Sequence, residues 1–297
     1  MSDDRRLRVG VAQIHPALGD LQSNLEKHLS WIERARLEGV ELLVFPELSL
    51  TGYDLGDRCA EMAIEVVHPL ADDVLRVIAE AAGDMFVVAG FVEEGFGAQL
   101  FNAGALFHQG EQLFVHRKLN LANYGDMQEA KFFAAGRYLE PFKLPKRFVG
   151  AMLLCSDCWN PALVHIAALH GATALIVPTN SSLDANSGDV TKPDRWDVVL
   201  RFYASLYGLP VIFCNRVGTE GAHTFWGGSR VLDPFGEVVA LAARDSEELL
   251  VAEIDLEAVK KARFLLPTVR DSNLDLIARE VDRLAQLVGV PRVVRDI

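Results

Sequence analysis

A cysteine at the end of an apolar segment holds the position of a nucleophile in this sequence. Cys155 follows the strand-like stretch Phe148–Leu154, and a helix is predicted from Pro161 after a tight turn. Unpaired backbone N–H groups and the dipole at a helix N-terminus favour a thiolate. Taken alone, a cysteine in such a place is more often a buried structural side chain, so both interpretations stay open at this point.

A second cysteine, Cys158, forms a C-x-x-C pair with Cys155. Such pairs occur in dithiol redox sites and as half of a zinc site. The remaining cysteines, Cys59 and Cys214, are isolated, so a four-cysteine zinc site would lack its second pair. Thioredoxin-like domains are also much shorter than this chain. We therefore expect Cys158 to be a small buried residue and predict no metal site.

Two charged residues stand where predicted strands end. Glu47 directly follows the apolar run Leu42–Pro46, and Lys118 ends the strand-like segment Gln112–Lys118. Ligands in α/β sheets bind at the carboxyl ends of strands. Either charge alone is more often a solvated strand-end residue. Together with a thiol, they supply what cleavage of an amide needs: a nucleophile, a proton acceptor and positive charge for the oxyanion.

The segments that must position these residues alternate between strands and helices. Strands are predicted at Leu7–Ile14, Leu42–Phe45, Met85–Val92, Ala103–Phe107, Gln112–His116, Phe148–Leu154, Ala174–Val177, Val211–Cys214, Ser229–Leu232, Val238–Leu241 and Leu249–Ile254. Helices are predicted from the N-cap Asp20 to Gly39, at Asp57–Ala82 with Pro69 dividing it, and at Pro161–His170, Arg195–Tyr207, Leu256–Phe264 and Asn273–Leu287. The pattern indicates mixed sheets covered by helices. No Ser/Gly-rich linker divides the chain, so we predict a single domain over residues 1–297.

Composition and charge narrow the classes of partner. The 297 residues are 50% hydrophobic and carry a net charge of −12, with no block of consecutive lysines or arginines. Nucleic acid and anionic membranes are therefore poor partners. The stretch without charged residues between Asp157 and Asp184 is broken by prolines, asparagines and histidines, so no membrane span is predicted. Four cysteines are too few for a disulfide framework, and the N-terminus does not resemble a secretory leader, so we expect a cytoplasmic protein.

Three short motifs carry a resemblance to a known family. The segments Phe45–Tyr53 (FPELSLTGY), Arg117–Leu119 (RKL) and Leu154–Pro161 (LCSDCWNP) resemble, in order and spacing, the three signatures of the nitrilase superfamily. These proteins are carbon–nitrogen hydrolases with a Glu-Lys-Cys triad. The resemblance extends over essentially the whole chain, through Val9–Gln13, Gly228–Gly236 and Ala252–Asp255.

The resemblance implies roles for four residues. Glu47 falls on the general base, Lys118 on the electrostatic stabiliser, Cys155 on the nucleophile and Glu129 on the family's auxiliary glutamate. The segment Asn123–Phe133 is similar to the corresponding loop in the glutaminase domain of glutamine-dependent NAD synthetases. The sequence contains no Ser-Gly-Gly ATP-pyrophosphatase loop, so we expect a stand-alone amide hydrolase.

The resemblance also implies a fold, a substrate class and an assembly. The fold is an α/β four-layer α-β-β-α sandwich of two mixed sheets, the assembly a homodimer or larger homo-oligomer, and no metal or organic cofactor is required. Nitrile-cleaving members usually carry Trp-Glu after the cysteine, whereas this chain has Ser156-Asp157, as in the amidase and carbamoylase branches. Candidate substrate-binding residues are the aromatic walls Tyr53 and Trp159, the pair Asn180 and Ser181, and Ser156, whose backbone N–H is a candidate oxyanion donor.

The expected reaction is cleavage of a small linear amide through a thioester acyl-enzyme, with release of ammonia or an amine. Two other activities stay open: hydrolysis of an N-carbamoyl amino acid, and a stand-alone glutaminase subunit that delivers ammonia to a separate synthetase. A non-catalytic binding scaffold on the same fold is a further alternative, which the four matched catalytic positions disfavour.

Overall fold

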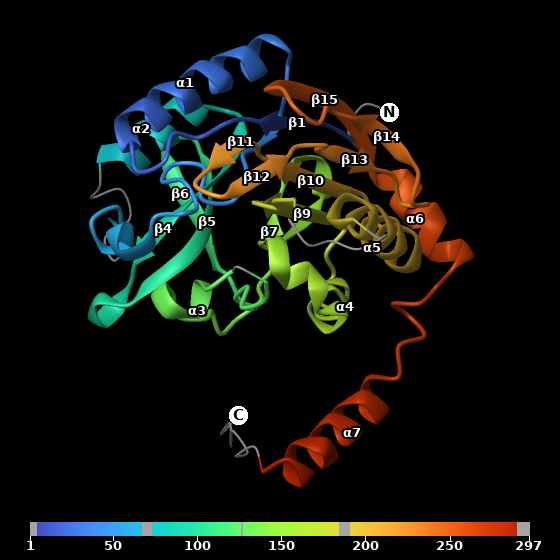
Figure 1. Cartoon of the computed structure of the whole chain (residues 1–297). Coiled ribbons are helices and arrows are strands. Elements are labelled where there is room, and N and C mark those ends of the chain that lie inside the picture. Colours follow the sequence, from blue (N-terminus) through green and yellow to red (C-terminus); the bar gives the residue numbers. More distant parts are fainter. Residues whose placement is uncertain (1–4, 67–72, 126, 184–190, 290–297) are drawn as a thin grey trace.

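A computed structural model describes residues 5–66, 73–125, 127–183 and 191–289, and two large mixed sheets form its centre (Figure 1). The first sheet has the strand order β15-β1-β2-β4-β5-β6, with β3 paired to β4. Its strands are β1 (Arg6–Gln13), β2 (Leu42–Val44), β3 (Ile64–Glu65), β4 (Phe86–Glu94), β5 (Leu100–His108), β6 (Glu111–Arg117) and β15 (Glu248–Asp255). The pairs β1–β2 and β2–β4 are parallel, whereas β1–β15, β4–β5 and β5–β6 are antiparallel.

The second sheet has the order β14-β13-β10-β9-β8-β7, in which β8, β9 and β10 run parallel. Its strands are β7 (Phe142–Lys143), β8 (Val149–Met152), β9 (Ala174–Thr179), β10 (Val211–Asn215), β13 (Arg230–Leu232) and β14 (Val238–Leu241). The strands β11 (Val217–Glu220) and β12 (His223–Trp226) pair as a separate hairpin. Both sheets therefore combine parallel and antiparallel neighbours.

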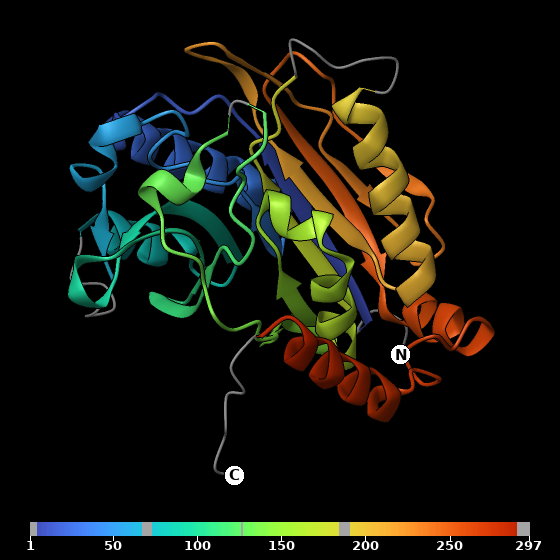
Figure 2. The same ribbon diagram turned by 60° about the horizontal axis from the view of Figure 1, so that its bottom comes forward.

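Helices cover the outer face of each sheet (Figures 1 and 2). The α-helices are α1 (Leu21–Leu37), α2 (Asp73–Ala82), α3 (Glu129–Phe132), α4 (Pro161–Leu169), α5 (Lys192–Tyr207), α6 (Leu256–Leu265) and α7 (Leu274–Leu287). Short 3₁₀ helices occur at Gly56–Ala60, Phe96–Ala98, Pro145–Arg147 and Cys155–Trp159. No helix within the described ranges combines the length and the apolar character needed to cross a membrane.

Alternating side chains along the strands explain the layers. In β2, Leu42 and Val44 pack between the two sheets in one apolar cluster with Ile176 of β9 and Ile212 of β10. Leu43 faces the other way, into the cluster that α1 and α2 form against the first sheet. Successive side chains of a strand point to opposite faces, so a strand buried on both faces reads as a continuous apolar run.

The second sheet is covered in the same way. Leu175 and Val177 of β9 pack against Trp196 and Leu200 of α5, whereas Ile176 between them faces the first sheet. Burying a side chain of this size typically contributes about 1.5–3 kcal/mol. The order of layers is therefore helices, sheet, sheet, helices, and the predicted four-layer sandwich of two mixed sheets is confirmed.

Most predicted elements are present, and one prediction is wrong. Asp20 caps α1 as expected, because its carboxylate accepts a hydrogen bond from the Ser23 backbone N–H. Within the described residues, the helix predicted over Asp57–Ala82 is present only as α2 (Asp73–Ala82). Ahead of it lie a 3₁₀ helix and the strand β3, which pairs with the end of β4. Pro69, expected to divide the helix, lies outside the described residues.

The last helix, α7, stands apart from the two sheets (Figure 1). None of its residues is buried, although its sequence alternates charged and apolar side chains with helical spacing. Its exposed apolar residues are Leu274, Leu276, Ile277, Val281, Leu284 and Leu287. Such a helix has an apolar face without a partner inside the described part of the chain.

Candidate active site

Four polar residues from both sheets meet where their strands end. Glu47 lies three residues after β2 and Lys118 directly after β6, so both come from the first sheet. Cys155 lies three residues after β8, and Asn180 follows β9, so both come from the second sheet. The parallel strands β8 and β9 end at the same edge, which brings Cys155 and Asn180 together.

The turn that carries Glu47 packs tightly against β4. A Cβ atom at Gly90 would lie 2.4 Å from the backbone nitrogen of Leu48, so only glycine permits this approach. Leu48 itself has a left-handed backbone with a φ of 47°, and the Leu50 N–H donates to the Gly90 carbonyl at 2.9 Å. The carboxylate of Glu47 is therefore fixed by its backbone as well as by its partners.

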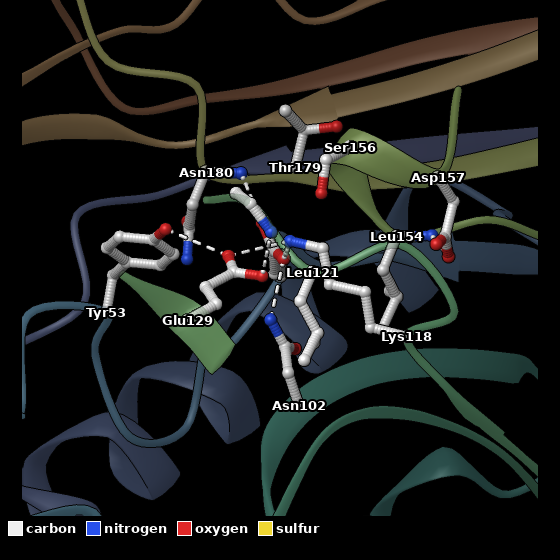
Figure 3. Close-up of polar contacts among 12 residues, drawn as sticks. Tyr53, Asn102, Lys118, Leu121, Glu129, Leu154, Ser156, Asp157, Thr179 and Asn180 are labelled. Carbon is white, nitrogen blue, oxygen red and sulfur yellow. Dashed lines mark hydrogen bonds and ion pairs between the residues drawn. The ribbon is translucent and has the colours of Figure 1, made fainter. Parts of the chain in front are cut away.

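One ammonium group joins two buried carboxylates (Figure 3). Lys118 Nζ lies 2.6 Å from Glu47 Oε1 and 2.8 Å from Glu129 Oε1, and all three side chains are buried. Glu129 is the first residue of α3, and its other oxygen accepts a hydrogen bond from the Ala122 N–H at 2.9 Å. The structure thus brings together three of the four residues that the resemblance assigned to catalysis, from segments far apart in sequence.

The carboxylate of Glu47 has two further donors. Asn102 Nδ2 donates to Glu47 Oε1 at 2.8 Å, and the Asn180 N–H donates to Oε2 at 2.9 Å. Sequence reasoning missed Asn102. The available signal was an asparagine within the otherwise apolar run of β5, because a polar residue buried in such a strand requires a partner.

Burial and the two carboxylates set the protonation of this cluster. Burial raises the pKa of Glu47, and Lys118 opposes the shift. Burial alone would lower the pKa of Lys118, but Glu129 and Glu47 together raise it well above its usual value. Lys118 is therefore a permanent cation, whereas Glu47 can accept and return a proton more readily than an exposed glutamate.

Cys155 faces the same cluster. Its side chain is buried, its φ is 43°, and it interacts electrostatically with Glu47 and Lys118. Burial and then the charge of Glu47 raise its pKa, while Lys118 and a backbone hydrogen bond from Asn180 lower it. Burial therefore acts against the thiolate that a helix N-terminus alone would favour. In this environment the sulfur needs a base to remove its proton.

Cys158 does not share this environment. It is fully buried among side chains of α4 and α5, and all four cysteines are free thiols. Within the described ranges, no group of three or more histidine, cysteine, aspartate or glutamate side chains is arranged to hold a metal ion. The position of Cys158 matches the interpretation as a small core residue.

A narrow pocket with a cavity volume of about 10 Å³ lies beside Cys155. It is lined by Tyr53, Ala122, Tyr124, Met127, Cys155, Trp159, Asn180, Ser181, Lys192 and Trp196. Four of the five predicted substrate-binding residues are in this set. Ser156 is not, because its hydroxyl group donates to the Asn120 carbonyl at 2.6 Å, so only its backbone N–H remains a candidate donor.

The predicted pocket residues differ in how their polar atoms are used. The Tyr53 hydroxyl donates to Glu129 Oε1 at 2.8 Å, and burial raises its pKa well above the usual value. The Ser181 hydroxyl oxygen accepts hydrogen bonds from the indoles of Trp196 and Trp226, each at 3.0 Å. By contrast, the side-chain nitrogen and oxygen of Asn180 are buried without a hydrogen-bond partner among the described residues.

Asp157 links the two sheets below the site, a role that sequence reasoning missed. Its Oδ1 accepts the N–H groups of Leu119 and Asn120 at 2.9 and 2.6 Å. Its Oδ2 accepts the Leu154 N–H at 3.0 Å and lies 3.1 Å from His116 Nε2. One buried carboxylate therefore fixes the segment after Lys118 against the turn that begins at Cys155.

Comparison with known proteins places this geometry in a family. The sequence model of the carbon–nitrogen hydrolases matches residues 8–264. The chain belongs to the carbon–nitrogen hydrolase family. The resemblance to the nitrilase superfamily that the motifs carried is thereby confirmed, and the family assignment supports a hydrolase.

Two kinds of curated carbon–nitrogen hydrolase relative are similar to the chain. A glutamine-dependent NAD(+) synthetase of Thermotoga maritima is 33% identical over 270 residues, which cover 90% of this chain and 45% of the synthetase. The chain thus spans less than half the length of that relative. An N-carbamoylputrescine amidase of Oryza sativa is 26% identical over 281 residues, covering 91% of this chain and 93% of the amidase.

Solved structures of the superfamily share the fold. A carbon–nitrogen hydrolase from Helicobacter pylori superposes with a TM-score of 0.78 at 28% identity, covering 92% of this chain and 97% of that one. An amidase from Nesterenkonia sp. gives a TM-score of 0.76 at 26% identity, with coverage of 93% and 97%. Both neighbours match the sandwich over nearly their whole length.

Proposed function

We propose that the protein is an amidase that cleaves the C–N bond of a small linear amide through a cysteine thioester. The observation that carries the proposal is the Lys118 ammonium held between the buried carboxylates of Glu47 and Glu129, next to the Cys155 thiol. This set contains a nucleophile, a base with a raised pKa and a fixed cation, which are the groups that acyl transfer requires.

In the acylation step, Glu47 removes the thiol proton as Cys155 Sγ attacks the carbonyl carbon. Lys118 and the Ser156 N–H stabilise the negative charge that develops on the carbonyl oxygen. Glu47 then returns the proton to the leaving nitrogen, the C–N bond breaks, and ammonia or an amine departs from a thioester.

In the deacylation step, water attacks the thioester carbon, and Glu47 accepts a proton from that water. The C–S bond breaks, a carboxylic acid is released, and the proton returns to the sulfur. Glu129 touches Lys118 and the Tyr53 hydroxyl, so its role is to hold the cation and one wall of the pocket in place. No step requires a metal or an organic cofactor.

Two finer assignments compete within this proposal. Similarity to glutamine-dependent NAD(+) synthetases supports a glutaminase that delivers ammonia to a separate synthetase. Similarity to N-carbamoylputrescine amidases over nearly their whole length supports hydrolysis of an N-carbamoyl compound, of which N-carbamoyl amino acids are the anionic examples. Ammonia release alone does not separate them, so the substrate panel must contain both classes.

The test is ammonia release from glutamine, short aliphatic amides, ω-amides and N-carbamoyl amino acids. We expect at least one class to be hydrolysed, and mass spectrometry of rapidly quenched enzyme to show an acyl adduct on Cys155. Cys155→Ala serves as the matched control. Turnover without an adduct on Cys155, or equal turnover by the control variant, would contradict the thioester mechanism.

We also infer a homodimer or larger homo-oligomer. The apolar face of α7 and the exposed Val198 and Phe202 of α5 support this inference, because such surfaces are usually covered in an assembly. Light scattering during gel filtration tests it, and a monomeric mass would contradict it.

We further infer a cytoplasmic location, with which the free cysteines are in keeping.

A further inference from the structure

The two donors that the proposed reaction directs at the carbonyl oxygen come from different sheets. Lys118 directly follows β6 of the first sheet, and Ser156 belongs to the 3₁₀ helix that follows β8 of the second sheet. Acyl transfer depends on the exact place of such donors, because they must lie at hydrogen-bond distance from the oxygen in the transition state. The ends of β6 and β8 must therefore be held in a fixed relation.

One buried carboxylate bonds to both of these strand ends. Asp157 Oδ1 accepts the N–H groups of Leu119 and Asn120, in the segment after β6, at 2.9 and 2.6 Å. Its Oδ2 accepts the Leu154 N–H at 3.0 Å, in the turn that carries the nucleophile (Figure 3). The side chain of Asp157 is fully buried, and hydrogen bonds to a charged group in such a place are strong. Each carboxylate oxygen is thus committed to one of the two segments.

Two further contacts strengthen this connection. The Ser156 hydroxyl donates to the Asn120 carbonyl at 2.6 Å, which is a second bond between the same two segments. His116, a buried residue of β6, has its Nε2 3.1 Å from Asp157 Oδ2. An ionised carboxylate only accepts hydrogen bonds, so Nε2 is the donor here. The imidazole therefore ties the carboxylate to the first sheet once more.

The backbone of the nucleophile needs such restraint. Cys155 has a φ of 43°, in the left-handed region that residues with a Cβ avoid. A backbone of this kind persists only where the surrounding structure fixes it. The bonds described above hold Leu154 and Ser156, the residues on either side of Cys155.

We propose that Asp157 is a positioning residue of the reaction, which sets the place of Cys155 Sγ and the Ser156 N–H relative to the Lys118 ammonium group. The proposal rests on the amidase function above and adds to it a residue that acts without touching the substrate. Asp157 is not among the described residues that line the pocket beside Cys155. Its loss should therefore impair the transition state more than the binding of the substrate.

Asp157→Asn breaks the connection at nearly constant volume. If the amide oxygen faces Leu119 and Asn120, the amide nitrogen faces the Leu154 N–H, and two donors oppose each other. The flipped amide loses the other two bonds instead. One segment is released in either case, so kcat should fall by about 10²–10³-fold, the loss typical of one oxyanion donor, while KM changes by less than about threefold. The substrate is the amide of the panel above that is hydrolysed fastest, and kcat is compared per folded molecule.

Two other variants complete the series. Asp233→Asn is the matched control, because Asp233 Oδ1 also accepts two backbone N–H groups, in the turn between β13 and β14. Its kcat should stay within about twofold of wild type. Ser156→Ala keeps the N–H but removes the hydroxyl bond to Asn120, so kcat should fall by about threefold to tenfold, the equivalent of one hydrogen bond. This variant tests the connection should Asp157→Asn fold poorly.

An aldehyde separates positioning from stability. Propanal should add to the Cys155 thiol: the C–S bond forms, and the thiol proton passes to the carbonyl oxygen, which gives a tetrahedral hemithioacetal. The oxygen of this adduct lies where the oxyanion develops, so bound propanal should protect Cys155 from iodoacetamide. The propanal concentration that halves the alkylation rate should rise by about tenfold or more in Asp157→Asn and stay unchanged in Asp233→Asn. A carboxylate that served stability alone would leave this concentration unchanged in the folded variant.

The outcomes separate this proposal from the function on which it rests. A wild-type enzyme that hydrolyses no amide of the panel, and whose Cys155 propanal does not protect, contradicts the amidase function. If wild type is active, an Asp157→Asn variant with kcat within about threefold of wild type overturns only the positioning role, and so does a loss confined to KM. Should that variant fail to fold, unchanged kcat and unchanged propanal protection in Ser156→Ala overturn it.

Discussion

Two buried ion clusters in this protein look alike by charge and burial but differ in what surrounds them. Lys118 lies between Glu47 and Glu129, whereas Arg216 pairs with Glu220. All five side chains are almost completely buried. The first cluster faces a thiol and a pocket, whereas the further contacts of the second cluster among the described residues are to backbone groups and an aromatic ring.

The charged groups of the second cluster, Arg216 and Glu220, bond to each other and to backbone groups that hold the fold together. Glu220 accepts the backbone N–H groups of Tyr53 and Asp54 at 2.9 and 3.0 Å. Arg216 donates to the Pro16 carbonyl at 3.2 Å, and its guanidinium lies 4.3 Å from the centre of the Phe225 ring. This pair fastens the β11–β12 hairpin to the loop that carries Tyr53. Buried charge therefore marks a reactive site only where a nucleophile and space for a substrate adjoin it.

The largest expected effect comes from removing the thiol that distinguishes the first cluster. Cys155→Ala should lower kcat by at least about 10⁴-fold, because no other group can form the acyl-enzyme. The fold should persist, as judged by circular dichroism. Cys158→Ala is the matched control and should keep most of the activity. Equal loss in both variants would reopen the C-x-x-C redox interpretation.

The next prediction contrasts the two cations: substitution of Lys118 should lower activity, whereas substitution of Arg216 should lower stability. Lys118→Arg keeps the charge, but a planar guanidinium does not fit the place of a compact ammonium between two carboxylates, so kcat should fall by about 10³-fold. Arg216→Met instead should lower the free energy of unfolding by about 3–5 kcal/mol, because Glu220 is left buried without its partner. Its kcat per folded molecule should stay within about threefold of wild type.

Denaturant unfolding and steady-state kinetics of Lys118→Arg and Arg216→Met check this contrast between activity and stability. Alkylation of Cys155 by iodoacetamide should also slow near neutral pH in Lys118→Met, because Lys118 lowers the pKa of the thiol. An unchanged alkylation rate, or an active Lys118→Arg, would show that the first cluster is structural like the second.

Glu129 tests whether the second carboxylate of the first cluster takes part in the chemistry. Glu129→Gln keeps the volume and removes the charge, so kcat should fall by more than about tenfold, or 1.4 kcal/mol of barrier. The amide oxygen can still accept from Tyr53 and Lys118, but the amide nitrogen then faces the Ala122 N–H, so kcat is compared per folded molecule after the melting temperature has been measured. A variant that retains more than a tenth of the wild-type kcat would make Glu129 a purely structural residue.

The smallest expected effect concerns pH. Burial raises the pKa of Glu47, so the acid limb of kcat/KM should lie above pH 4.5, and activity should be lost as pH falls through it. The Asn102 hydrogen bond lowers this pKa, so Asn102→Ala should move the acid limb to higher pH. Asn273→Ala, at the start of α7, is the control. An acid limb that stays in place in Asn102→Ala would exclude Glu47 as the titrating base.

Whereas Glu47 governs activity at low pH, Lys118 governs stability at high pH. Its pKa is higher in the folded protein than in the unfolded chain, so the folded state retains its proton to higher pH. Its contribution to stability is therefore complete below about pH 10.5 and is lost only as pH rises towards the folded pKa. Comparison of alkaline unfolding of wild type and Lys118→Met isolates this contribution.

The sequence predicted what local patterns specify. Glu47, Lys118 and Cys155 each follow a strand, and the layers follow from strands such as β2 and β8 that are buried on both faces. The roles of Asn102 and Asp157 were not predicted, because they depend on contacts between distant segments. Asn102 contacts a residue 55 positions away, and Asp157 contacts a segment about 40 positions away. The helix predicted from Asp57 failed because pairing of β3 with β4 overrides local preference there.

The protonation of Cys155 shows a limit of a different kind. The position of Cys155 between a strand end and a helix favoured a thiolate, but this prediction considered only the effect of the helix N-terminus on the thiol pKa. The depth of burial and the nearby Glu47 charge act in the other direction and prevail. Both depend on packing around the residue, which no short motif records.

The backbone of Cys155 carries a cost that any other L-residue at this place would inherit. With a φ of 43° it occupies the left-handed region, which side chains with a Cβ adopt at an expense of roughly 1–2 kcal/mol. Glycine alone escapes that expense. An inert Cys155→Gly protein should consequently melt above the Cys155→Ala protein, which makes it the better vehicle for trapping an uncleaved substrate.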